Sequence, residues 1–239
     1  MLNKKLSAIA IASSLALGAS AASAEISGNV ALTTDYKFRG ISQSDESPAI
    51  QGGFDYEHES GFYVGTWGSS VDFDTNGGGY DGSLELDAYA GFANSFGDSD
   101  FGYTVGAIYY AYPGDDGDEG DYWEVNAGVS WKDLSFLVSY SDDYYAETGK
   151  FYYIQGDYSY TLPMDFVLDL HVGYNSFDEA PGFLSSTEDQ YWDYSIGITK
   201  SLFGVDLTLA GVGTDLDEED VFDTKWGDAA AVFTISKSL

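Results

Sequence analysis

The side chains that could do chemistry in this sequence are mostly carboxylates, and bases are scarce. The 239-residue chain has nine Lys and Arg against forty Asp and Glu, which gives a formal net charge of −31. Two of the bases, Lys37 and Arg39, lie two residues apart and follow Asp35 at the same spacing. Bases placed this way could brace a protein interior by pairing with acids, or could form one side of a field across a solute path. The sequence leaves both roles open.

The two histidines are the other candidates for catalysis. Asp169 and His171 share one alternating row and Asp206 and Thr208 share another, so a hydrolase with a Ser or Thr nucleophile can be imagined. No nucleophile motif accompanies His171, and His58 lies in a turn-like segment. A lone histidine in a polar row is more often a hydrogen-bonding residue. We therefore predict that the protein is not an enzyme, and we expect no cofactor.

Acids are densest in two runs, GDDGDEGD at 114–121 and DLDEED at 215–220. Carboxylate oxygens are the ligands that calcium prefers, but no complete EF-hand or nonapeptide spacing is present. The alternative is a solvated, mutually repelling rim, which is common in loops that must stay soluble. We predict no metal site, and calcium binding by these loops stays an open alternative.

Composition narrows the class of protein. The chain has twenty Tyr, fifteen Phe and 29 Gly but no Cys, which excludes disulfides and thiol chemistry. No basic patch is available for nucleic acid, and no apolar run after the first residues reaches transmembrane-helix length. Residues 1–24 have a basic start, an apolar middle and an Ala-Ser-Ala end, which predicts a secretory signal peptide cleaved before Glu25.

Hydrophobicity alternates with a period of two through most of the chain. From Gly28 to Gly40, apolar and aromatic residues occupy one face and polar residues the other, which predicts one long strand there. Eleven further alternating stretches follow, so we predict twelve strands. Short and long connections between them also alternate. This arrangement is typical of an up-and-down transmembrane antiparallel β-barrel, which we expect over residues 25–239.

Aromatic residues near the strand ends support the barrel over a secreted β-sandwich, which also alternates. The predicted strands are nearer ten residues long than the five or six usual in sandwiches. We expect an aromatic girdle on the lipid face formed by Tyr36, Phe38, Tyr109, Trp123, Trp131, Tyr158 and Tyr160.

The polar faces of the strands should line the interior of the barrel. We expect this lining to be formed by Asp35, Lys37, Arg39, Asp55, Glu57, Asp72, Glu85, Asp87, Glu124, Asp157, Asp169, His171, Asp193 and Asp206. Because acids outnumber bases, an open pore of this kind should prefer cations. The alternative is a closed structural or adhesive barrel with a packed polar interior, since twelve strands leave room for either. Whether the loop over 175–190 folds inward is open.

Three stretches of the chain are similar in sequence to one family: DYKFRGISQS at 35–44, PAIQGGFDYEHESGFYVGTWGSSVDF at 48–73, and TISKSL at the end. They resemble the TorF-like family of proposed porins, proteobacterial outer-membrane proteins first described as conserved proteins of unknown function. The resemblance covers the mature chain and is most specific over its first three strands. It implies a pore role without an established substrate, and it brings no catalytic or binding residues.

The resemblance also implies a location and partners. The location is the outer membrane of a Gram-negative bacterium, reached through the periplasm. The expected partners are outer-membrane lipid and lipopolysaccharide, the barrel-insertion machinery during assembly, and small solutes or cations. The terminal strand resembles the assembly signal of such proteins, although Leu239 replaces the usual Phe and Lys237 interrupts the apolar series.

Overall fold

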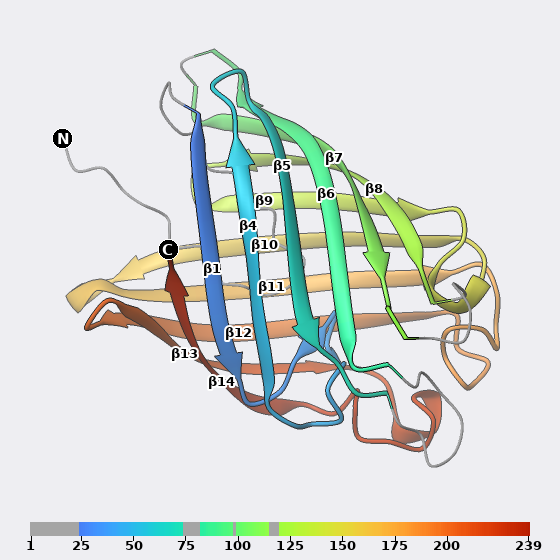
Figure 1. Ribbon diagram of the computed structural model, residues 1–239. Helices are drawn as coiled ribbons and strands as arrows, with labels where there is room; N and C mark the ends of the chain where they lie inside the picture. The colour runs from blue at the N-terminus through green and yellow to red at the C-terminus, as the bar shows by residue number, and fades with distance from the viewer. Residues whose placement is uncertain (1–23, 74–81, 98, 115–119) are drawn as a thin grey trace.

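A computed structural model describes residues 24–73, 82–97, 99–114 and 120–239. Twelve of its strands form one closed antiparallel barrel, which confirms the predicted fold class and strand number (Figure 1). The predicted signal peptide falls on residues 1–24, nearly all of them outside the described residues. The described chain has no helix long and apolar enough to cross a membrane.

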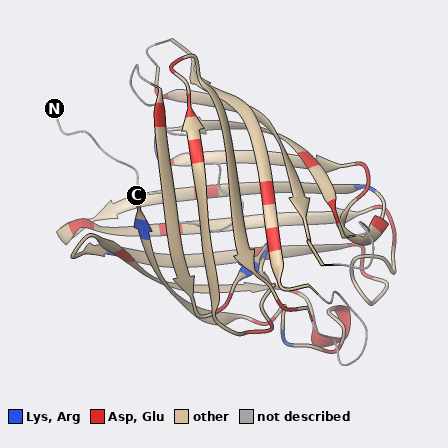
Figure 2. Ribbon diagram, in the orientation of Figure 1, with Lys and Arg blue, Asp and Glu red and all other residues tan. Residues whose placement is uncertain are grey.

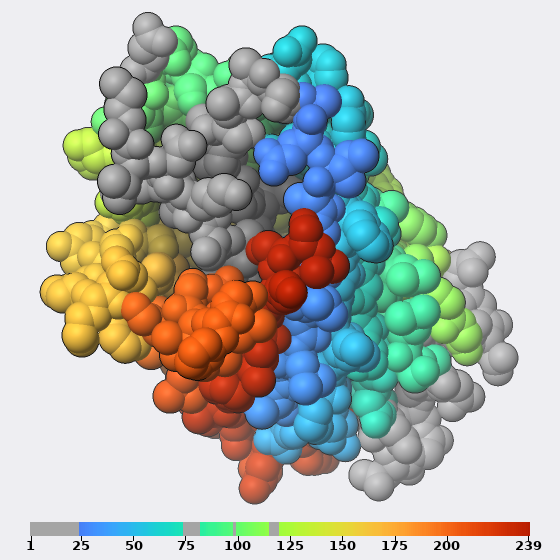
Figure 3. Space-filling model, turned by 60° about the vertical axis from the view of Figure 1, so that its left-hand side comes forward, coloured from blue at the N-terminus to red at the C-terminus, as the bar shows by residue number. Residues whose placement is uncertain are grey.

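Most of the barrel strands have nine to thirteen residues. They are β1 (Glu25–Thr33), β4 (Ala49–Glu57), β5 (Phe62–Ser70), β6 (Leu84–Ser95), β7 (Phe101–Ala111), β8 (Tyr122–Trp131), β9 (Leu134–Ser141), β10 (Phe151–Leu162), β11 (Phe166–Phe177), β12 (Gln190–Leu202), β13 (Val205–Thr214) and β14 (Ala230–Ser238). Each pairs with its neighbours in sequence, and β1 closes the barrel by pairing with β14. Figure 3 shows this closure as the blue start of the described chain lying beside its red end.

Side chains alternate between the two faces of the barrel wall. Phe54, Ile196 and Leu209 are more than half exposed on the outer face. Glu85, Glu124 and Thr199 are almost fully buried on the inner face. An apolar outside and a polar inside are the reverse of a soluble barrel, and they suit a wall that meets lipid.

The two ends of the barrel differ in the length of their connections. One end, called here the short-turn end, has turns at 58–61, 132–133, 163–165 and 203–204, and the described residues 96–97 and 99–100 lie there too. The opposite end, called here the long-loop end, carries 34–48, 142–150, 178–189 and 215–229, together with the described parts of two further connections, 71–73 with 82–83 and 112–114 with 120–121. The long loops contain the short 3-10 helices η1 (Tyr145–Glu147) and η3 (Glu218–Asp220), while η2 (Pro163–Asp165) lies in a short turn.

Two sequence predictions about the wall are wrong. The first strand ends at Thr33 instead of continuing to Gly40, so Tyr36 and Phe38 do not belong to the outer aromatic girdle. Both rings are buried inside, at 3% and 6% exposure. Trp67 also faces inward, where it packs edge-on against Tyr36. Of the other girdle residues, Tyr109, Trp123, Trp131 and Tyr160 are exposed on the outside, and Tyr158 is partly so.

Candidate functional site: a hairpin inside the barrel

The first long connection, residues 34–48, folds into the barrel as a small hairpin. Its strands are β2 (Lys37–Phe38) and β3 (Ile41–Ser42), which pair with each other and with no wall strand. The two turn residues, Arg39 and Gly40, have positive φ values of 48° and 82°. Positive φ at both central residues is the condition for the tight hairpin turn that matches strand twist. We call residues 34–48 the inward hairpin.

A lysine anchors the inward hairpin to the last long loop. The Lys37 ammonium donates hydrogen bonds to the backbone carbonyls of Trp226 at 2.8 Å and Asp228 at 3.0 Å. The Asp35 carboxylate lies 3.9 Å from the Lys37 ammonium. Burial lowers the pKa of Lys37, and the charge of Asp35 partly opposes that shift. The Trp226 indole N–H also donates a hydrogen bond to the Asp45 carboxylate at 2.9 Å, which is a second contact between the inward hairpin and this loop.

An arginine at the hairpin tip spans the interior. Arg39 donates one hydrogen bond from each terminal nitrogen to the two carboxylate oxygens of Glu124 on β8, both at 2.7 Å. The two side chains are 2% and 1% exposed. Burial alone would lower the pKa of Arg39, but the Glu124 carboxylate outweighs burial and raises it. A bidentate, charge-assisted pair of this kind is among the strongest polar contacts available to a protein.

Aromatic rings surround the Arg39 guanidinium. Its central carbon lies 4.3 Å from the ring centre of Tyr153, 4.6 Å from that of Phe38 and 4.7 Å from that of Phe151. These distances are well inside the range of cation–π attraction, which strengthens when water is excluded. On the backbone side, the Tyr191 hydroxyl donates to the Arg39 carbonyl at 3.1 Å.

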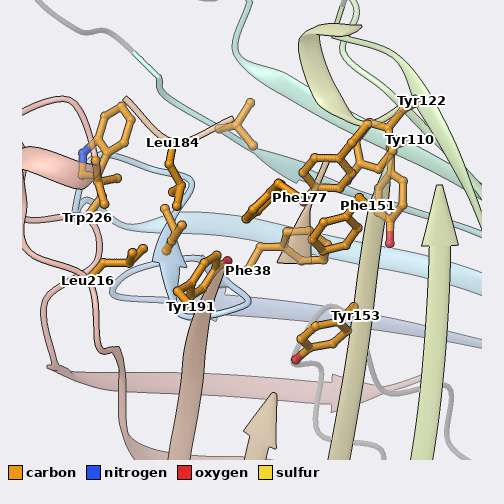
Figure 4. Close-up of a cluster of buried hydrophobic side chains, with 14 of the residues drawn as sticks. Phe38, Tyr110, Tyr122, Phe151, Tyr153, Phe177, Leu184, Tyr191, Leu216 and Trp226 are labelled. Carbon is orange, nitrogen blue, oxygen red and sulfur yellow. The ribbon is translucent and has the colours of Figure 1, made fainter. Parts of the chain in front are cut away.

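The rings belong to a larger cluster that fills the long-loop end (Figure 4). Leu184 of the loop over 178–189 joins this cluster at 2% exposure, so that loop also reaches inward. The buried cluster comprises Tyr36, Phe38, Ile41, Ala49, Val71, Tyr110, Tyr112, Tyr122, Tyr144, Phe151, Tyr153, Phe177, Leu184, Tyr191, Leu216, Val221 and Trp226. With the inward hairpin it packs this end of the barrel with side chains.

The remaining predicted lining residues divide into three sets. Glu85, Asp87, Glu124 and Asp193 are buried on inner faces of the wall. Asp55, Asp157, Asp169, His171 and Asp206 lie closer to the short-turn end and are partly exposed. Glu57 at the end of β4 and Asp72 beyond the end of β5 are exposed. Asp72 lies outside the wall strands, and so do Asp35, Lys37 and Arg39, which the sequence had assigned to the first strand.

His171 sits between two acids of neighbouring strands. Its Nδ1 lies 2.6 Å from the carboxylate of Asp157, and its Nε2 lies 2.8 Å from that of Asp193. The Tyr153 hydroxyl is 3.0 Å from the same Nε2. Each ring nitrogen is thus held by a carboxylate, and the hydroxyl beside Nε2 belongs to Tyr153, which is itself fully buried. Within the described ranges, no group of three or more His, Cys, Asp or Glu side chains is arranged to hold a metal ion.

Exposure divides the interior into a packed half and a wetter half. Towards the long loops, Gln51, Tyr153 and Asn175 are at most 5% exposed. Towards the short turns, Ser27, Asp55 and Asp169 remain partly exposed although they point inward. The barrel is therefore packed with side chains near its long loops. Nearer the short turns its inner face is mixed, because Thr104 and Thr199 are each 2% exposed while the acids there keep partial exposure; this half is called here the wetter half. Acidic positions predominate over basic ones along the strands (Figure 2).

Several residues that build the site carry no recognisable signal in the sequence. Tyr144 lies in the loop over 142–150, Phe151 and Tyr153 lie in β10 and Tyr191 lies in β12, and only the closed barrel brings these side chains to Arg39. An Arg-Gly pair between two short alternating stretches does suggest a hairpin turn. That pair was the one local sign that the strand stops early.

Several solved structures are similar to this chain in fold. The chain superposes on the KdgM porin with a TM-score of 0.55 at 9% identity, covering 89% of this chain and 97% of that one. For the NanC porin the TM-score is 0.56 at 11% identity, covering 89% and 98%. KdgM has also been solved in complex with a disordered oligogalacturonate. At such low identity these likenesses show the fold alone, which is that of outer-membrane porins.

Comparisons of sequence place the chain in a family. No curated protein matches it. Residues 18–239 match the model of a family described as "Bacterial protein of unknown function (Gcw_chp)". That description does not carry the narrower TorF-like label, which remains a resemblance. Because the match spans nearly the whole chain, the protein belongs to the Gcw_chp family of bacterial proteins of unknown function.

Proposed function

We propose that the protein is an outer-membrane channel of the porin type that lets small solutes diffuse passively, and that the inward hairpin closes its long-loop end in the conformation described above. The observation that carries this proposal is that inward-pointing acids in the wetter half of the interior are partly exposed to solvent. Partly exposed acids there point into a closed barrel whose outer face is apolar. A polar interior accessible to water is the arrangement that porins use.

The charge of the lining supports cation preference. Asp55, Asp169 and Asp206 lie in the wetter half without a basic partner among the described residues. Rings of acidic side chains favour cations over anions. Oligogalacturonate, with which the KdgM porin has been solved, is a polyanion. An acidic lining would repel such a polyanion, so neutral or cationic solutes are the ones we propose for this barrel.

The location and partners follow from the same proposal. The mature chain over 25–239 would lie in the outer membrane of a Gram-negative bacterium, with lipid and lipopolysaccharide against its apolar face. The barrel-insertion machinery would assemble it there. An enzymatic role fits less well, because both nitrogens of His171 are held by acids.

A second candidate is a structural or adhesive barrel that does not conduct. It is favoured by the packed half, where Arg39, Glu124 and the aromatic cluster leave little room for solutes. The two candidates differ in one measurable property, which is ion conductance.

The test is single-channel recording of the purified barrel in a planar bilayer, with reversal potential measured under a salt gradient. We expect cation-selective openings. Neutralising Asp55, Asp169 and Asp206 with Asn should move the reversal potential toward zero. Neutralising the exposed loop acids Glu218, Glu219 and Asp223 is the matched control and should change it less, because distant exposed charges are screened. An anion-selective wild type would contradict the charge argument. A wild type that never conducts, even with the hairpin released, would favour the structural barrel.

A further inference from the structure

Two acids in the packed half have no counter-charge. Glu85 and Asp87 are 1% and 4% exposed and stand two residues apart on the inner face of β6. The other buried acids of the interior have cationic or strong hydrogen-bonding partners, as Glu124 has with Arg39 and Asp193 with His171. No Lys, Arg or His among the described residues lies within ion-pair distance of Glu85 or Asp87.

Oxygen atoms of both carboxylates also lack hydrogen-bond partners. Glu85 accepts one hydrogen bond, from the Tyr36 hydroxyl at 3.2 Å, and that bond goes to Oε1. Its Oε2 and the Oδ1 of Asp87 are buried without a partner. Among the described residues, seven of the eight such buried side-chain atoms are oxygens, so the interior has more acceptors than hydrogen-bond donors to satisfy them.

An isolated buried carboxylate is strongly disfavoured, and two neighbouring ones are more so. The pair must therefore be neutralised, either by protons or by a bound cation. We propose that Glu85 and Asp87 bind one divalent, oxygen-seeking cation beneath the inward hairpin. Two carboxylates match a charge of two, and hard cations such as Ca²⁺ take oxygen ligands in flexible geometry.

Neutral oxygens complete the surroundings of the pair. The Tyr36 hydroxyl already contacts Glu85. Ser69 lies directly opposite Glu85 in the β5–β6 register, and Tyr110 lies opposite Asp87 in the β6–β7 register. Directly opposed residues on one face have Cβ atoms about 4.5–5.5 Å apart, so both hydroxyl-bearing side chains start beside the carboxylates. The proposed site thus has two carboxylate ligands and neutral hydroxyl ligands around them. It contains two acids, which is why it is not one of the groups of three or more ligating side chains considered above.

Tyr36 links this site to the inward hairpin, because it immediately precedes Lys37. A cation on Glu85 and Asp87 would remove the repulsion beneath Tyr36 and hold the hairpin seated. Without it, the two acids would gain from hydration, which requires the hairpin to move. The inference goes beyond the proposed function and applies equally to a barrel that does not conduct.

The experiment uses Tb³⁺, a luminescent stand-in for Ca²⁺, on the full-length folded barrel in detergent after divalent cations are removed. The ring of Trp67 lies 5.5 Å from that of Tyr36, so excitation of these rings should sensitise an ion bound between Tyr36 and Glu85. We expect one equivalent of sensitised Tb³⁺ per barrel, displaced by Ca²⁺. The variant Glu85→Gln/Asp87→Asn should lose it. Glu218→Gln/Glu219→Gln removes the same charge from an exposed loop and should keep it.

Heat-dependent gel mobility reports whether each variant is folded, and Glu85→Gln alone replaces the double variant if the latter does not fold. A cysteine at Ile41, which is 4% exposed, gives a second readout, since the chain has no native cysteine. Removing cations should make this cysteine react faster with a thiol reagent, and Ca²⁺ should restore protection. Equal Tb³⁺ signals in wild type and Glu85→Gln/Asp87→Asn would overturn the proposal. So would a wild type that binds no ion, because the acids would then carry protons.

Discussion

Arg39 and Glu124 are 85 residues apart in sequence and meet inside the barrel through two hydrogen bonds of 2.7 Å. Arg39 belongs to the inward hairpin after β1, and Glu124 belongs to β8. The pair therefore ties the hairpin to a wall strand that is not its neighbour in the barrel. Both side chains are shielded from water, so each charge depends on the other.

Removing one member of this pair should destabilise the barrel strongly. Arg39→Gln leaves Glu124 buried without its partner, and we expect a loss of about 3–5 kcal/mol in the free energy of unfolding. Equilibrium unfolding in urea, followed by the gel mobility of the folded barrel, measures this loss. The double variant Arg39→Met/Glu124→Leu should recover most of the lost stability, because it leaves no unpaired charge in the interior.

The exposed pair of Lys150 and Asp178 supplies the control for that experiment. Its atoms are 3.8 Å apart, and its side chains are 54% and 61% exposed. Exposed pairs contribute about 0–1 kcal/mol, so Lys150→Gln should unfold almost as the wild type does. If Arg39→Gln lowers the free energy of unfolding as little as Lys150→Gln does, the contact between Arg39 and Glu124 does not hold the inward hairpin in place.

Alkaline pH should loosen the long-loop end through Tyr144. Burial raises the pKa of Tyr144 to about 12, although the charge of Arg39 partly opposes this. The ordinary value near 10 applies in the unfolded chain. A phenol with a raised pKa stabilises the fold fully below pH 10, and this contribution disappears as the pH rises from 10 to about 12. The difference is about 3 kcal/mol.

Tyr144→Phe tests this because it keeps the ring that stacks on Phe151 at 4.1 Å and removes the titrating group. We expect the variant to lose less stability than the wild type between pH 9 and 11.5 in urea titrations. Tyr160→Phe, which changes a ring that is 48% exposed on the outer face, is the matched control. Identical pH profiles for wild type and Tyr144→Phe would show that the phenol does not titrate with unfolding.

The sequence predicts the wall well because a strand with one lipid face and one polar face leaves a period of two in the residues. The inward hairpin defeats the same rule. Lys37 and Arg39 alternate with Tyr36 and Phe38 as wall residues would, yet both rows are buried. A period of two shows that successive side chains point to opposite sides of the strand. It does not show whether each side meets lipid, water or the protein interior. Only the Arg39–Gly40 turn breaks the pattern, and it is two residues long.

Pairing within the site was partly predictable. A chain with so few bases and two of them in one row indicates that they serve nearby acids, and Asp35 is close enough in sequence to be named. Glu124 is not, because its contact with Arg39 depends on how twelve strands close. The same holds for the aromatic cluster, whose members are ordinary alternating residues until the barrel and its loops place them together.

Orientation in the membrane follows from the two ends of the barrel. Long loops face the cell exterior in outer-membrane barrels, so Glu218 in η3 should lie outside and Asp133 in the β8–β9 turn should face the periplasm. Single cysteines at these two positions can be compared in intact cells with a membrane-impermeant thiol reagent. We expect labelling at 218 and not at 133, with both labelled after the cells are broken. Labelling at 133 alone would invert the barrel. By the same rule the acids at 115–116 are expected to face outward, and they lie outside the described residues.

Gly40 is the position where one methyl group should unseat the inward hairpin. A Cβ added there would lie 2.5 Å from the Thr214 methyl and 2.8 Å from the Gly213 carbonyl oxygen, and φ is +82°. We therefore expect Gly40→Ala to shift the inward hairpin toward a released state, in which it no longer packs inside the barrel. A cysteine at Ile41 should then react several-fold faster, and bilayer recordings should show more frequent or larger openings.

Gly204 separates the effect of contact from that of backbone strain. Its φ is +81°, nearly that of Gly40, but a Cβ added there meets nothing within 4 Å. Gly204→Ala strains a short turn at the opposite end and should leave both the reactivity of the Ile41→Cys reporter and the conductance close to those of the wild type. If Gly40→Ala behaves like Gly204→Ala, the hairpin tolerates the methyl group in place. If Gly40→Ala exposes the cysteine without any conductance, the hairpin moves but does not close a path, and the structural barrel becomes the better description.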